Sequence, residues 1–104
     1  MIYFITDTKN IKIGYTNNSI EKRLKQLQTS CASKLYILGW IDGDLDTEKM
    51  LHKIFAQSRI RYNGEWFNPT EDLINYINEN NCKENVSVFY DGNIVLPYLS
   101  IKQV

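Results

Sequence analysis

The sequence predicts a small α+β domain in which helices flank a three-stranded antiparallel sheet. Three observations lead to this class: short apolar runs of strand length, helix-type spacing of apolar residues, and polar turn or cap residues between them. The predicted order is β-β-α-β-α-α, followed by a C-terminal β-hairpin. A chain of 104 residues, 43% of them hydrophobic, suffices for one compact domain and is too short for two.

The first two predicted strands form a hairpin. Residues 2–6 and 11–16 are rich in β-branched and aromatic side chains, and the polar stretch 7–10 between them suits a short connection. If that loop closes simply, Tyr3 lies opposite Gly14 in the antiparallel pair.

This register decides which side chains share a face of the sheet. It places Ile5 opposite Lys12, so Tyr3 and Lys12 project from the same face. Gly14, which has no side chain, then leaves open space beside the tyrosine ring. A slip of one residue would move every side chain of one strand to the other face.

A first helix follows the hairpin. Asn18 and Glu21 have the spacing of a capping box. At about 100° per residue, Arg23 falls on the margin of the apolar stripe, whereas Lys22 and Lys25 point outward. A marginal arginine can lie over the sheet, although such side chains often only extend toward solvent. The apolar stripe consists of Ile20, Leu24 and Leu27.

A third strand and a second helix come next. Residues 35–41 form a mostly apolar run, and residues 46–57 have helical spacing. Glu48 and His52 lie four residues apart and share one border of that helix's apolar face. His52 is the only histidine, and such a residue is more often a packing or capping residue than a catalyst.

The remaining segments predict a loop, a third helix and a hairpin. Residues 58–63 are polar and basic, and Glu65 then places a carboxylate between a glycine and two aromatic residues that we expect to plug the core from a turn. Residues 68–71 supply a cap, a first-turn proline and a capping glutamate for a helix that ends near Asn80. Residues 86–101 surround an Asp-Gly turn and predict a β-hairpin.

The sequence also indicates the cellular compartment in which we expect the protein. No apolar run approaches membrane-spanning length and no signal pattern opens the chain, so we expect a cytoplasmic protein, in the host cytoplasm if the chain is viral. Cys31 and Cys82 lack the spacing of a zinc or redox motif, which favours free thiols.

Charge is balanced overall and divided along the chain. The formal net charge is zero, which argues against nonspecific coating of nucleic acid. Residues 1–41 carry a balance of +4 and residues 42–84 a balance of −4. A basic region beside an acidic one could present a phosphate to a metal held by carboxylates, and an ordinary solvated surface explains the division equally well.

Five short segments, taken in order, resemble the GIY-YIG nuclease superfamily. Residues 1–3 stand at its first motif, residues 12–16 at its second, and Arg23 at its helix arginine. Residues 51–55 and 64–67 are similar to two further segments of a phage and viral branch whose motifs read KIGYT and GEWF. The resemblance implies a GIY-YIG-like domain over residues 1–82, with residues 83–104 as a C-terminal hairpin extension.

The resemblance implies a divalent-metal-dependent endonuclease that hydrolyses phosphodiester bonds of DNA. Glu65 would hold a single Mg²⁺ or Mn²⁺, and Arg23 would contact a phosphate oxygen. Tyr3 would orient or deprotonate the attacking water, with Lys12 as its neighbouring cation, and His52 is the candidate for a further catalytic role. The substrate-binding candidates are Gly14, Lys22, Lys25 and Arg61.

Two departures from the family pattern keep other functions open. Lys12 replaces the second tyrosine, and Leu27 stands where many members carry a histidine or tyrosine. One alternative is a catalytically silent module that binds DNA or protein. Another is a phage regulatory or inhibitor protein that binds a partner, or a second copy, through its C-terminal hairpin.

Overall fold

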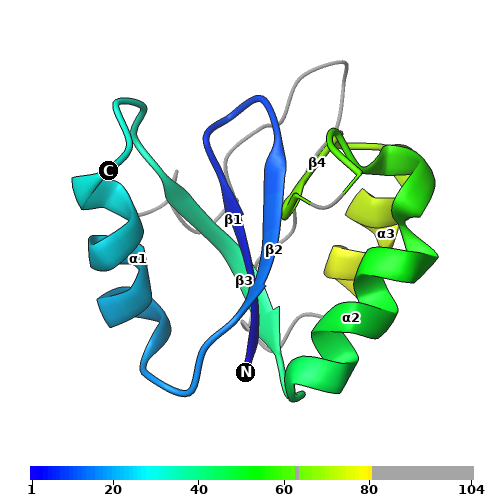
Figure 1. The fold of residues 1–104 in the computed structure, drawn as a ribbon, viewed down its shortest axis with the longest axis horizontal. Helices are drawn as coiled ribbons and strands as arrows, with labels where there is room; N and C mark the ends of the chain where they lie inside the picture. Colours follow the sequence, from blue (N-terminus) through cyan, green and yellow to red (C-terminus); the bar gives the residue numbers. More distant parts are fainter. Residues whose placement is uncertain (63, 81–104) are drawn as a thin grey trace.

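The described residues of the computed structural model, 1–62 and 64–80, form the predicted α+β fold (Figure 1). The elements in chain order are β1 (Ile2–Thr6), β2 (Ile11–Tyr15), α1 (Ile20–Thr29), β3 (Tyr36–Ile41), α2 (Leu45–Ile54), a 3-10 turn (Ala56–Ser58), β4 (Trp66–Phe67) and α3 (Glu71–Asn80). The predicted hairpin of residues 86–101 and the expected boundary between residues 82 and 83 lie outside the described residues.

Within the described residues the sheet has four strands rather than the predicted three. All neighbours are antiparallel, in the order β3-β1-β2-β4. The additional strand is the aromatic segment that we expected to be a turn: Phe67 pairs with Ile11, and Trp66 with Lys12. A strand of two residues is too short to show alternation in the sequence, which explains the error.

The predicted register of the first hairpin is confirmed. In the β1–β2 pair Tyr3 lies opposite Gly14, and Ile5 lies opposite Lys12. The space left by Gly14 is filled by the tyrosine ring itself, because a Cβ atom built on this glycine would lie 2.2 Å from both Cζ and Oη of Tyr3. The absence of a side chain at position 14 therefore allows the ring to lie directly over the neighbouring strand.

Strand alternation gives the sheet two differently covered faces. Figure 1 shows α1 on one side of the sheet and α2 with α3 on the other. The face toward α2 and α3 holds the larger apolar core, whose buried strand residues are Ile2, Phe4, Ile11, Ile13, Leu38, Ile41 and Phe67. The face toward α1 holds a smaller cluster whose buried members are Tyr3, Ile5, Ile20 and Leu35.

The helix starts differ slightly from those expected. Ser19, not Asn18, is the N-cap of α1, and its hydroxyl accepts a hydrogen bond from the Lys22 backbone N–H. Asparagine and serine are both favourable N-cap residues, so the sequence alone does not show which of the two adjacent residues caps the helix. Helix α2 begins after a capping box between Asp44 and Thr47, and it ends at Ile54, three residues before its expected end.

The contact between Tyr3 and Gly14 gives a test of this packing. We expect Gly14→Ala to lower the free energy of unfolding by about 1–3 kcal/mol, because the added methyl group overlaps the buried ring. Chemical denaturation measures this change. In a Tyr3→Ala background the same substitution should cost much less, and an equal cost in both backgrounds would show that the ring is not what excludes the methyl group.

Candidate functional site

The face of the sheet that carries α1 brings Tyr3 and Arg23 together. The Tyr3 hydroxyl accepts a long hydrogen bond from Nε of Arg23, at 3.5 Å, and Nη1 of the same guanidinium donates to the Gln26 side chain at 3.3 Å. Arg23 is half-buried on the helix margin, as predicted. No carboxylate of the described residues forms an ion pair with it. Its guanidinium contacts the uncharged side chains of Tyr3 and Gln26.

Lys12 and Glu65 form an ion pair, and Lys12 projects from the same face of the sheet as Tyr3. The Lys12 ammonium lies 2.7 Å from Oε2 of Glu65, and the two side chains are 11% and 41% exposed. Residue Glu65 is held against β2 because its carbonyl oxygen accepts from the Ile13 N–H at 3.0 Å. A largely buried ammonium requires such a partner. The Lys12 nitrogen also lies 5.6 Å from the centre of the Trp66 ring.

A second carboxylate, Glu48, stands near this ion pair. Burial raises the pKa of its carboxyl above the ordinary value, and the negative charge of Glu65 raises that pKa further. His52, a hydrogen bond from the Tyr15 backbone N–H, and Lys12 act in the opposite direction. The half-buried Glu48 comes from α2, so the sequence alone could not reveal that it lies near Glu65.

His52 lies on the other face of the sheet. Its Nε2 is 3.0 Å from the Ile13 carbonyl oxygen, and its Nδ1 is 3.2 Å from Nη2 of Arg59. Because arginine can only donate, Nδ1 accepts and Nε2 donates to the carbonyl. The ring is buried, and its centre lies 5.2 Å from that of Phe67. The structure therefore does not bring His52 together with Tyr3 and Arg23.

The substrate-binding candidates lie on three different segments of the chain: β2, α1 and the segment before β4. Lys22 and Lys25 are exposed on α1 and flank Arg23 in the sequence, as expected. Gly14 is covered by the tyrosine ring, so it shapes the site rather than offering a contact surface. Arg61 is exposed in the segment that precedes β4, where it lines a separate cavity.

The described residues thus place the Tyr3–Arg23 contact and the Lys12–Glu65 ion pair in one small α+β domain, with exposed lysines on α1. Residues 1–87 match the T5orf172 domain, and the chain belongs to this phage-associated family, which is related to nuclease-like domains. No curated protein and no solved structure matches the chain. Within residues 1–62 and 64–80, no helix is both long and apolar enough to cross a membrane.

The environment of Glu48 predicts a pH-dependent change in stability. A carboxyl whose pKa is raised on folding binds its proton more tightly in the folded state, so the stability it contributes is lost as pH rises through the raised value. Glu48→Gln removes the buried charge and retains an oxygen that can accept from Tyr15. We expect it to raise the midpoint of thermal unfolding at about pH 8 and to have little effect near pH 4.

The matched control is Asp42→Asn, since Asp42 is an exposed carboxylate just before the same helix. It should leave the unfolding midpoint nearly unchanged across the same pH range. Lower stability of Glu48→Gln at about pH 8 would mean that the charged form of Glu48 is favoured by folding, contrary to its surroundings.

Proposed function

We propose that this protein is a GIY-YIG-type DNA endonuclease that hydrolyses phosphodiester bonds with the help of a divalent cation. The observation that supports this best is the position of Arg23, which is held by the Tyr3 hydroxyl and has no carboxylate partner in the described part of the chain. Family membership and the order of the sequence motifs support the same reaction class.

Arg23 is the group we assign to the scissile phosphate. Its planar guanidinium can donate two parallel hydrogen bonds to phosphate oxygens, and this interaction strengthens as negative charge develops during attack. Tyr3 is only 1% exposed, and its hydroxyl contacts Arg23, so it acts here as a positioning residue.

Glu65 is the residue we assign to the cation. Its side chain is 41% exposed, and only Oε2 is engaged by Lys12. Among the described residues, no group of three or more His, Cys, Asp or Glu side chains could enclose a metal ion. These features fit a mostly hydrated Mg²⁺ or Mn²⁺ held by one carboxylate, an arrangement that Mg²⁺ accepts. When bound, such a cation would neutralise phosphate charge and polarise a water molecule.

Lys12 supplies a second fixed positive charge in this region. Its ammonium is held in place by Glu65 and lies near the Trp66 ring. Hydrolysis forms a bond between the water oxygen and phosphorus and breaks the bond between phosphorus and the leaving oxygen. One proton of the water ends on the leaving oxygen, which departs as a hydroxyl group, and the other is shared by the new phosphate end and the solvent. The chain contributes mainly charge and positioning to this step.

A catalytically silent DNA-binding module is the second candidate. The Lys12–Glu65 ion pair favours it, because that pair satisfies the carboxylate without a metal. The buried position of His52, away from Arg23, also leaves the site without a histidine base.

Cleavage of supercoiled plasmid and labelled oligonucleotides separates these functions. With Mg²⁺ or Mn²⁺ we expect cutting that EDTA stops. Glu65→Gln should abolish this activity, because a neutral amide binds a hard cation weakly. Arg23→Ala should lower the rate by about 10²–10³-fold, the usual effect of removing one transition-state donor.

The control is Lys53→Ala, which removes an exposed cation from α2 on the opposite side of the sheet. It should cut like the wild type. Undiminished cutting by both site variants would overturn the assigned roles. DNA binding without cutting by the folded wild type would establish the silent module instead.

A further inference from the structure

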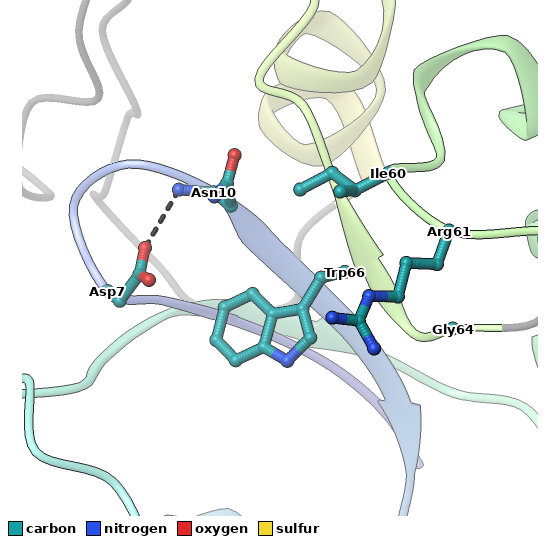
Figure 2. A pocket seen from close by; sticks show the side chains of 6 residues that line it. All are labelled: Asp7, Asn10, Ile60, Arg61, Gly64 and Trp66. Carbon is teal, nitrogen blue, oxygen red and sulfur yellow. Dashed lines mark hydrogen bonds between the residues drawn. The ribbon is translucent and has the colours of Figure 1, made fainter.

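A cavity of about 430 Å³ lies between the β1–β2 turn, β4 and the segment that precedes β4. Its volume is in the range of pockets that hold small organic groups. Figure 2 shows the indole of Trp66 at its centre. The lining residues are Asp7, Asn10, Ile60, Arg61, Gly64 and Trp66.

The middle of this cavity is lined by an aromatic side chain, Trp66, and an aliphatic one, Ile60. Trp66 is half-buried, since β4 holds its backbone while the indole reaches the cavity. The side chain of Ile60 is 45% exposed and points into the same space (Figure 2). A flat ring could stack on the indole and contact the isoleucine, an arrangement that suits a nucleobase.

The two ends of the cavity differ in charge. Asp7 and Asn10 lie on one side of the indole, and the guanidinium of Arg61 lies on the other (Figure 2). Oδ1 of Asp7 accepts from the backbone N–H groups of Lys9 and Asn10, at 2.9 and 2.8 Å, which fixes the carboxylate in place. Its negative charge repels a phosphate, whereas Arg61 attracts one.

We propose that this cavity binds one unpaired nucleotide of a nucleic-acid strand. The base stacks on Trp66 with its edge toward Asp7 and Asn10, and its phosphate lies toward Arg61. Every base carries an N–H group on its pairing edge, and this group can donate a hydrogen bond to a carboxylate oxygen. Binding therefore tolerates different bases. A base inside a perfect duplex cannot occupy the cavity, because its edge is paired and both its faces are stacked.

The position of the cavity connects it to the proposed nuclease site. Trp66 follows Glu65 directly, and its ring centre lies 5.6 Å from the Lys12 ammonium. This inference rests on the proposed function for its substrate class, which is DNA with unpaired nucleotides at the scissile phosphate. Binding itself requires neither metal nor cleavage.

Binding in EDTA tests the inference independently of cleavage. The probes are four fluorescein-labelled DNAs: a single strand, its perfect duplex, the same duplex with one bulged nucleotide, and a duplex with an unpaired end. Fluorescence anisotropy measures their dissociation constants. We expect the three DNAs with unpaired nucleotides to bind at least about fivefold more tightly than the perfect duplex, an effect typical of stacking one base.

Substitutions at three positions locate that binding. Arg61→Ala and Asn10→Ala change residues at the cavity surface, and each should weaken binding of the single strand severalfold. Trp66→Leu should weaken it by about tenfold or more, whereas Trp66→Phe, which keeps a ring, should retain most of the affinity. Lys53→Ala, at an exposed residue of α2 that does not line the cavity, is the matched charge control and should bind like the wild type.

Equal affinity for all four DNAs, or unchanged binding by Arg61→Ala and Asn10→Ala, would overturn the inference. A preference for unpaired DNA that these variants abolish, in a protein that never cuts, would support the cavity while removing the nuclease function. Cutting by a protein that shows no such preference would support the nuclease function and overturn the cavity inference.

Discussion

The pairing register of β1 with β2 is the constraint on which the rest of the structure depends. Because side chains alternate along a strand, this single alignment sends Ile11 and Ile13 to one face and Lys12 to the other. The isoleucines join the core under α2 and α3. The lysine joins Tyr3 under α1, where it meets the Glu65 carboxylate. One local alignment thus separates the hydrophobic layer from the polar groups of the candidate site.

Much of this arrangement could be predicted, because it rests on local patterns. Alternation and a short loop determine the first hairpin, and helical spacing places Arg23 on the margin of α1. The pairing of β4 could not be predicted, since two residues carry no period. The face occupied by His52 was also hidden, because the spacing of an amphipathic helix does not reveal which side of a sheet the helix covers. The ion pair of Lys12 with Glu65 joins residues 53 positions apart, which no local pattern encodes.

Among the described residues, the short β4 pairs with Ile11 and Lys12 of β2, and α2 contacts backbone groups further along that strand. His52 contacts the Ile13 carbonyl oxygen, and the Glu48 carboxylate accepts from the Tyr15 N–H. These residues stand four apart on one helix border, so they meet the strand edge together. Covering an edge in this way protects it from pairing with another chain. The structure therefore gives the Glu48–His52 spacing an architectural role.

The separation of Lys12 from Glu65 also has a consequence for synthesis of the protein. Contacts between distant residues form late, because a long loop must close first, and domains fold progressively as the ribosome extends them. Tyr3 and Arg23 are present once α1 has been made, but Glu65 arrives 53 residues after Lys12. A nascent chain thus carries an incomplete set of site residues until β4 emerges and pairs with β2. The order of synthesis therefore leaves the ammonium of Lys12 without its Glu65 partner until nearly two thirds of the chain has been made.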